Sequence, residues 1–303
     1  MKRDFLTLLD CSASEIDMLI GRAGELKAMQ KRGKPHHPIK GKTVGLLFNK
    51  PSTRTKLSFE VGIYQLGGNV SILNPDQLQI GRGETIQDTA RVISRYLDGL
   101  VIRTGPQSQI EEFARHSTIP IINGLTDEFH PCQIVGDLLT IREIKGDEKR
   151  LKIVYVGDGN NIANTVLCAA AVLGLNVVIV SPQKYSISKS MIAQISKVDK
   201  KNWKLTSDIK EGVTGADVIM TDVWVSMGQE GKSIASKKKA LRPYQINNKI
   251  VALAAPDAIV MHCLPAHKGE EITEEVFEGP KSVVFDQAEN RLHVQKAILE
   301  WLL

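Results

Sequence analysis

Residues 43–56 read TVGLLFNKPSTRTK, and this stretch decides the fold. The apolar run from Thr43 to Phe48 predicts a buried strand, a polar loop follows it, and the pattern from about Arg54 to Leu66 is helical. A strand, a loop and a helix in this order are the repeating unit of parallel α/β sheets. The polar loop is therefore expected at the carboxyl end of a strand, where such sheets bind their ligands.

Residues on both sides of this stretch continue the pattern. Ser12 and Glu15 form a capping box, and an amphipathic helix follows until Gly33. The apolar face of this helix comprises Ile16, Leu19, Ile20, Ala23 and Leu26. Further strands are expected at 70–73, 99–102 and 119–122, and helices at 84–97, 108–116 and 131–144.

The charged stretch at 145–150 interrupts the pattern, and a strand at 151–156 restarts it. Strands at 177–180, 218–221 and 259–262 follow with helices between them, and a last helix at about 287–303 is expected to pack back on the first half. The sequence thus predicts an α/β fold with two doubly wound parallel-sheet domains, 1–145 and 146–303, and a shared interdomain crevice.

Composition is that of an ordinary globular protein. Of the 303 residues 42% are hydrophobic and 24% charged, which argues against disorder, and no apolar run reaches the roughly 18 residues of a membrane helix. The net charge of +5 is spread along the chain and aromatic residues make up 5%, so we expect no nucleic-acid partner. The cysteines form no C-x-x-C pair and predict reduced thiols in the cytoplasm; they are Cys11, Cys132, Cys168 and Cys263.

The Gly157-Asp158-Gly159 turn after a strand suggests a dinucleotide site, but two features that would support it are missing. The third glycine of that motif would fall at Ile162, and the next strand ends in Ser181 instead of an acidic residue. The sequence also lacks a P-loop and lacks paired Cys and His ligands at metal-binding spacing. We therefore expect no cofactor and no metal.

The stretch Pro51-Ser52-Thr53-Arg54-Thr55-Lys56 brings hydroxyls, a guanidinium and backbone N–H groups together at a helix N-terminus, an arrangement that binds anions. A helix cap with a solvated arginine explains the same residues equally well from local composition. Arg103, directly after the strand at 99–102, brings a second guanidinium to the strand ends. Two arginines there favour a phosphate.

Five blocks of sequence resemble, in order, the signature of the aspartate/ornithine carbamoyltransferase family. They are Ser52-Thr53-Arg54-Thr55, Arg103-Thr104, His130-Pro131-Cys132-Gln133, Asp222-Val223-Trp224-Val225-Ser226-Met227-Gly228 and His262-Cys263-Leu264-Pro265. The resemblance covers nearly the whole chain, and the last two blocks resemble the ornithine branch.

This resemblance implies transfer of a carbamoyl group from carbamoyl phosphate to the δ-amine of L-ornithine, giving L-citrulline and phosphate. The reaction would serve arginine biosynthesis or, in reverse, arginine catabolism. Two alternatives are a carbamoyltransferase for another amine such as putrescine, and a catalytically silent paralogue with a binding role. Retention of Arg54, Arg103, His130, Asp222 and Cys263 argues against the silent paralogue.

The resemblance also implies roles for single residues. For carbamoyl phosphate it implies contacts from Ser52, Thr53, Arg54, Thr55, Gln79, Arg103, His130, Gln133, Cys263, Leu264 and Arg291. Among these, Arg103, His130 and Cys263 would be catalytic. Arg103 and His130 would act on the carbonyl oxygen, where negative charge builds in the tetrahedral transition state. Gln133 and the Leu264 carbonyl would fix the carbamoyl NH₂ group.

For ornithine, the resemblance implies three carboxylate anchors, which are Asn161, Ser226 and Met227. Asp222 would pair with the α-ammonium group, and Cys263 would lie beside the attacking amine. From local sequence alone, Asp222 could cap a helix and Cys263 could be a buried apolar side chain. His262 is expected to pack or to orient its neighbours.

The family's assembly implies a homotrimer with sites shared between subunits. Gln79, in the stretch Gln79-Ile80-Gly81-Arg82-Gly83-Glu84, would then reach the neighbour's carbamoyl phosphate. Local composition alone favours a different interpretation, a flexible surface loop.

Overall fold

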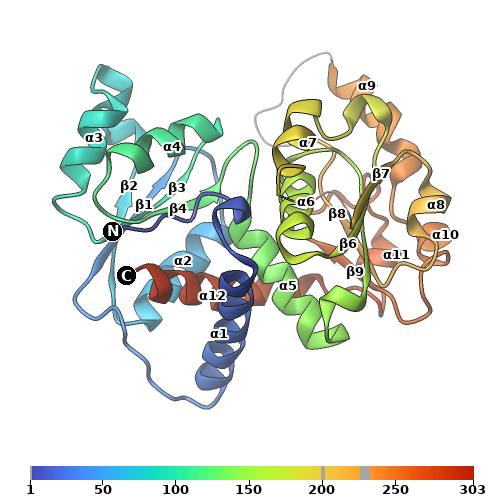
Figure 1. Cartoon of the computed structure of the whole chain (residues 1–303), viewed down its shortest axis with the longest axis horizontal. Helices are drawn as coiled ribbons and strands as arrows, with labels where there is room; N and C mark the ends of the chain where they lie inside the picture. Colours follow the sequence, from blue (N-terminus) through green and yellow to red (C-terminus); the bar gives the residue numbers. More distant parts are fainter. Residues whose placement is uncertain (1, 199–201, 226–232) are drawn as a thin grey trace. The chain divides into compact units, whose positions relative to one another are not determined.

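The computed structural model describes residues 2–198, 202–225 and 233–303. The chain divides into two compact units: unit 1 comprises Met1–Leu139 and Glu289–Leu303, and unit 2 comprises Thr140–Ala288. Each unit contains one parallel sheet with helices on both faces, the doubly wound α/β arrangement (Figure 1). The functional boundary expected after residue 145 stays a prediction.

The sheet of unit 1 has the strand order β2-β1-β3-β4, with all neighbours parallel. Its strands are β1 (Thr43–Phe48), β2 (Asn69–Leu73), β3 (Gly99–Arg103) and β4 (Ile121–Leu125). The helices that begin in this unit are η1 (Leu8–Asp10), α1 (Ala13–Lys31), α2 (Arg54–Gln65), η2 (Pro75–Gln77), η3 (Gln79–Arg82), α3 (Ile86–Ile93), α4 (Gln107–His116) and α5 (Pro131–Lys145). Helix α2 lies on one face of the sheet, and α3 and α4 lie on the other (Figure 1).

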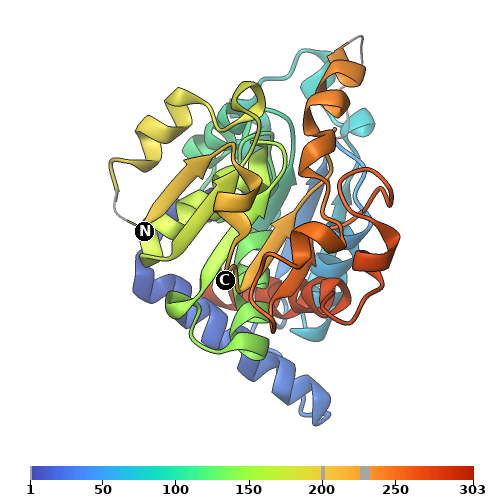
Figure 2. The ribbon, with the colours of Figure 1, turned by 90° about the vertical axis from the view of Figure 1, so that its right-hand side faces the viewer.

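The sheet of unit 2 has the order β7-β6-β5-β8-β9, again all parallel, and Figure 2 shows it from a second direction. Its strands are β5 (Lys152–Val156), β6 (Asn176–Val180), β7 (Trp203–Thr206), β8 (Val218–Thr221) and β9 (Ile259–His262). The helices are η4 (Glu148–Arg150), α6 (Asn161–Leu173), η5 (Gln183–Tyr185), α7 (Lys189–Ile195), α8 (Ile209–Val213), α9 (Ser233–Leu241), η6 (Arg242–Tyr244), α10 (Asn248–Val251), α11 (Glu274–Phe277) and α12 (Val284–Leu302), whose last part belongs to unit 1.

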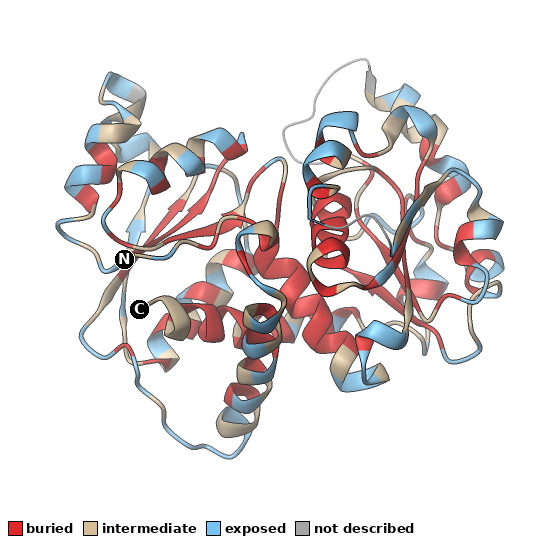
Figure 3. Ribbon diagram, in the orientation of Figure 1, coloured by how far each residue is buried: buried red, intermediate tan, exposed pale blue. Residues whose placement is uncertain are grey.

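The strongest sequence patterns are confirmed. Helix α1 begins after the capping box of Ser12 and Glu15, and β1 has the predicted bounds. The predicted apolar face of α1 is buried, namely Ile16, Leu19, Ile20, Ala23 and Leu26. In unit 2, α6 is buried on nearly all sides, with only Asn161 and Val172 partly exposed (Figure 3). A helix that is apolar all round belongs in a protein core.

Two sequence predictions are wrong in detail. The fourth strand runs from Ile121 to Leu125 instead of 119–122, because Pro120 has no N–H to donate and the backbone N–H of Asn123 donates to Phe5. Strand β7 was not predicted at all. It is a half-buried edge strand, so it lacks the continuous apolar run that marks the inner strands.

Among the described residues, no helix combines the length and the apolar character needed to span a membrane.

Candidate functional site

The polar residues of unit 1 meet at one edge of its sheet. Phe48 at the end of β1 pairs with Arg103 at the end of β3, and Arg103 pairs with Leu125 at the end of β4. Because these strands are parallel, the residues that follow them lie at the same edge. This edge collects residues 49–55, 103–104 and 126–130.

Helix α2 begins at this edge with Arg54. Its N-cap, Thr53, makes no side-chain capping hydrogen bond, so the capping interpretation does not explain the hydroxyls of Ser52 and Thr53. The first N–H groups of a helix lack partners within that helix and favour an anion. Arg54 is half-buried, and Thr55 is buried.

A buried hydrogen-bond network joins Thr55 to the last helix. Arg291 of α12 donates from Nη2 to Thr55 Oγ1 and from Nη1 to Gln133 Oε1, both at 2.7 Å. Gln133 in turn donates through Nε2 to Asp137 Oδ1 at 2.8 Å. Since Thr55 Oγ1 accepts from Arg291, its own hydrogen is available for a ligand. Gln133 Oε1 likewise has a second lone pair.

His130 is buried among the arginines of this edge. Burial lowers the pKa of His130 well below its usual value, and the positive charges of Arg291, Arg103 and Arg54 lower it further. The imidazole is therefore neutral at physiological pH and keeps one N–H to donate. These four residues form what we call the arginine cluster: Arg54, Arg103, His130 and Arg291.

Gln79 lies on η3 with an exposed side chain, and none of the hydrogen bonds above involves it. Ser226 and Met227 lie outside the described residues. Cys132, in the same sequence block as His130, donates its thiol to the Asn123 carbonyl, and burial raises its pKa to about 12. Its role is structural.

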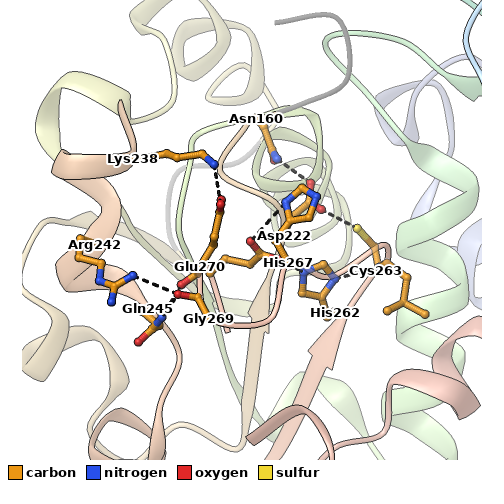
Figure 4. Close-up of polar contacts among 12 residues, drawn as sticks. Asn160, Asp222, Lys238, Arg242, Gln245, His262, Cys263, His267, Gly269 and Glu270 are labelled. Atoms are coloured by element: carbon orange, nitrogen blue, oxygen red, sulfur yellow. Dashed lines mark hydrogen bonds and ion pairs between the residues drawn. The ribbon is translucent and has the colours of Figure 1, made fainter. Parts of the chain in front are cut away.

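In unit 2, Asp222 and Cys263 follow the ends of β8 and β9 and contact one another. The Cys263 thiol donates to Asp222 Oδ1 at 2.9 Å, and Asn160 donates from Nδ2 to Asp222 Oδ2 at 2.6 Å (Figure 4). Asn160 Oδ1 caps α6 by accepting the N–H groups of Ile162 and Ala163. The carboxylate of Asp222 is thus fixed on both oxygens, and Asn161 is the first residue of the capped helix.

The Gly157-Asp158-Gly159 turn is built for close packing. A Cβ on Gly159 would lie 2.5 Å from the Ser186 carbonyl carbon, so only glycine fits there. Burial raises the pKa of Asp158, although Lys237 donates to its carboxylate at 2.7 Å and opposes that shift. Packing accounts for Gly159, and the ion pair with Lys237 accounts for Asp158.

In the described part of the chain, two groups of side chains have ligand atoms close enough to hold a metal ion: Asp222, His262 and Cys263, and His267, Glu270 and Glu271. In both groups these atoms make hydrogen bonds with the protein. His262 Nε2 lies 3.0 Å from Glu271 Oε1, and Lys238 donates to Glu270 Oε1 at 2.5 Å.

Sequence reasoning missed Asn160 and Glu271. The signal for Asn160 is its place before the apolar run of α6, where an asparagine is a good N-cap. No sequence signal marks Glu271, because its contact with His262 depends on how the chain folds between them.

Comparison with family models matches residues 3–143 to the carbamoyl-P binding domain of aspartate/ornithine carbamoyltransferase and residues 149–302 to its Asp/Orn binding domain. A protein of Syntrophus aciditrophicus named ornithine carbamoyltransferase is 53% identical over 100% of both chains. Ornithine carbamoyltransferase from Pyrococcus furiosus has a similar structure, with TM-score 0.93 and 48% identity over 98% of this chain and 96% of that one. Anabolic ornithine carbamoyltransferase from Campylobacter jejuni also has TM-score 0.93, with 40% identity over 100% and 99% of the two chains.

The strand ends carry arginines in one parallel sheet and a fixed carboxylate and thiol in the other, and the two matched domains are those of an α/β transferase. The matches cover both halves of the chain. The chain belongs to the aspartate/ornithine carbamoyltransferase family.

Proposed function

We propose that this chain transfers the carbamoyl group of carbamoyl phosphate to the δ-amine of L-ornithine, giving L-citrulline and phosphate. The observation that carries the proposal is the arginine cluster, in which three guanidiniums surround a neutral imidazole. Relatives about 50% identical over the full chain are named ornithine carbamoyltransferase, which supports ornithine as the acceptor.

Unit 1 binds carbamoyl phosphate. The phosphate takes charge-assisted hydrogen bonds from Arg54 and Arg103, together with the hydroxyls and N–H groups at the start of α2. Gln133 accepts from the carbamoyl NH₂ group through the second lone pair of Oε1. Because Arg291 holds both Thr55 and Gln133, it positions the two groups that contact the carbamoyl end.

The arginine cluster stabilises the transition state. Attack by the amine places negative charge on the carbonyl oxygen, and preorganised donors stabilise this charge more than they stabilise the ground state. Thr55, Arg103 and His130 are these donors. His130 donates as a neutral imidazole, since the surrounding guanidiniums disfavour a second proton.

Unit 2 binds ornithine. Asp222 pairs with the α-ammonium group, and Asn161 and the Ser226-Met227 segment anchor the carboxylate. Asn160 holds the Asp222 carboxylate in place, and Cys263 lies beside the amine that attacks. When both α-groups of ornithine are held, the δ-amine is the group left to approach the carbonyl carbon. Holding the two reacting atoms in the right orientation accounts for a large part of an enzyme's rate enhancement.

The direct test is an acceptor panel. Purified protein is incubated with carbamoyl phosphate and ornithine, putrescine, aspartate, N-acetylornithine or lysine, and the ureido product is quantified. We expect ornithine to give the highest kcat/KM. A preference for another amine would overturn the substrate assignment, and no product with any amine would overturn the activity.

We also propose that the protein is a homotrimer in the cytoplasm, with Gln79 of one subunit contacting the neighbour's carbamoyl phosphate. Exposed apolar side chains on α2, Leu57 and Tyr64, and Ile72 on the edge strand β2 support a protein-protein contact on unit 1. The four cysteines are free thiols, in keeping with a reducing compartment.

A further inference from the structure

We propose that His262, held by Glu271, positions the Cys263-Leu264 turn through the unprotonated Nδ1 of its neutral ring. The inference rests on the proposed function, in which the Leu264 carbonyl and the Cys263 thiol face the substrates. His262 does not itself contact substrate in this proposal. It is a positioning residue.

The first observation is how the ring of His262 is bonded. The backbone N–H of Leu264 donates to His262 Nδ1 at 2.9 Å, and His262 Nε2 lies 3.0 Å from Glu271 Oε1. Figure 4 shows the position of the His262 ring beside Cys263. A ring nitrogen that accepts from an N–H carries no hydrogen, so the ring hydrogen is on Nε2 and donates to Glu271. Both side chains are fully buried, which fixes this tautomer.

The second observation is the backbone of Leu264. Its φ is +59°, and it is the one non-glycine residue with positive φ in the described part of the chain. A leucine adopts this left-handed conformation only when its surroundings enforce it. The hydrogen bond from the Leu264 N–H to His262 Nδ1 closes this turn and so sets the direction of the Leu264 carbonyl.

The third observation is the anchoring of Glu271. Its Oε1 also accepts the backbone N–H of His267 at 2.5 Å, and its carbonyl accepts the N–H of Ile246 at 2.8 Å. The preceding residues are held as well, because Gln245 donates to the carbonyls of Gly269 and Glu270 (Figure 4). Glu271 therefore belongs to a rigid segment and can hold the ring in one orientation.

The ring of His262 therefore affects two groups that face the substrates, the Cys263 thiol and the Leu264 carbonyl. Cys263 lies between His262 and Leu264 and donates to Asp222, so a change in the turn moves the thiol and the carbonyl together. A histidine that served only to fill space would need neither ring nitrogen. The acceptor at Nδ1 is the atom that links the ring to the turn.

Two variants of His262 test the two ring nitrogens one at a time. In His262→Asn, the amide oxygen lies where Nδ1 was and can still accept from Leu264. In His262→Gln, the amide nitrogen lies where Nε2 was and can still donate to Glu271, but no acceptor remains for Leu264. We expect kcat/KM for citrulline formation to fall about 30- to 100-fold in His262→Gln, because a misplaced reacting group costs rates of this size. The fall in His262→Asn should be at least about tenfold smaller.

The unfolding temperature of each variant is measured with its kinetics, and His37→Asn, a change at an exposed side chain of unit 1, is the control. Similar unfolding temperatures with the predicted difference in kcat/KM support positioning. Equal losses in the two variants, or full activity in both, would overturn it. If wild-type protein makes no citrulline, the proposed function fails instead.

A second measurement uses the wild-type protein and so does not depend on how the variants fold. In wild-type protein with ¹⁵N-labelled histidine, the ring nitrogens of His262 should show hydrogen on Nε2 and none on Nδ1. Hydrogen on Nδ1 would overturn the proposal whether or not the enzyme is active.

Discussion

His130 shows how one residue's role is set by its neighbours. An imidazole in water is partly protonated near neutral pH, and a protonated ring would be attracted to the phosphate as well as to the carbonyl oxygen. Burial and three guanidiniums lower its pKa well below the usual value, so the ring remains neutral. Its single N–H is then a directional donor suited to an oxygen that gains charge in the transition state.

This assignment leads to a pH prediction for the reaction. The δ-amine of free ornithine, with a lysine-like pKa of about 10.4, is unprotonated in roughly one molecule per thousand at pH 7.5. His130 does not titrate near neutral pH, since its pKa is lowered well below that range. We therefore expect kcat/KM for ornithine to rise from pH 6.5 to pH 8.5 as more of the amine loses its proton. Titration of His130 should not alter the profile in this range.

The measurement is the initial rate of citrulline formation at subsaturating ornithine and saturating carbamoyl phosphate. A flat profile, with chemistry shown to be rate-limiting, would contradict attack by the free amine.

Arg54 and Asp222 should separate the two substrates. Arg54→Ala removes a charge-assisted phosphate contact, so we expect kcat/KM for carbamoyl phosphate to fall about 100-fold or more. Asp222→Asn keeps the shape but removes the charge that pairs with the α-ammonium group, so KM for ornithine should rise about tenfold or more. Steady-state kinetics with each substrate varied in turn measures both effects.

Arg91→Ala is a suitable control, because this arginine is exposed on α3. This variant should leave kcat/KM for carbamoyl phosphate and KM for ornithine unchanged. Unaltered affinity for carbamoyl phosphate in folded Arg54→Ala would mean that the start of α2 is not the phosphate site.

At the scale of elements, helix α6 connects folding to substrate binding. Asn160 caps this helix and also holds Asp222. Asn247 caps α10 by accepting from the N–H groups of Lys249 and Ile250, with the same pair of distances, 3.0 and 3.2 Å. The two caps therefore match in their bonds to the helix, while Asn160 also contacts Asp222 and accepts from the Tyr155 hydroxyl at 3.2 Å.

We predict that Asn247→Ala lowers the free energy of unfolding by about 1 kcal/mol, the typical effect of losing a cap. Asn160→Ala should lower it by more, because the buried Tyr155 hydroxyl also loses its acceptor. Only Asn160→Ala should raise KM for ornithine, because only Asn160 orients the Asp222 carboxylate. Urea unfolding and steady-state kinetics measure the two effects. Equal KM values in both variants would show that Asp222 needs no support from Asn160.

Elements with a strong local pattern could be predicted from sequence. Strand β1 has its predicted bounds and the capped, periodic α1 its predicted start, because burial and capping act on neighbouring residues; α1 ends at Lys31, shortly before the expected Gly33. Strand β7 could not be predicted, since an edge strand is half-solvated and its stability comes from pairing with β6. The arginine cluster joins residues from α2, β3 and α12, and only the sequence resemblance brought Arg291 into the list beforehand.

At the scale of the whole molecule, unit 1 carries the features of a subunit contact. Leu57 and Tyr64 lie seven residues apart on α2, which places them on one helical face, and both are more than half exposed. Ile72 lies on the edge strand β2. Exposed apolar groups beside an open sheet edge favour association with another chain. Gln79, six residues after β2 ends, is exposed and near this surface in sequence.

A shared site predicts complementation between two inactive variants. In a cyclic trimer with head-to-tail contacts, Arg54 of one chain and Gln79 of the next would complete one site. When Arg54→Ala and Gln79→Ala subunits are refolded together in equal amounts, random assortment restores both native residues at about a quarter of the interfaces. Activity should therefore reappear on mixing, measured as citrulline formation per trimer, with each variant refolded alone as the control. If verified mixed trimers keep the activity of the single variants, Gln79 does not complete a neighbour's site, and its exposed position on η3 has another explanation.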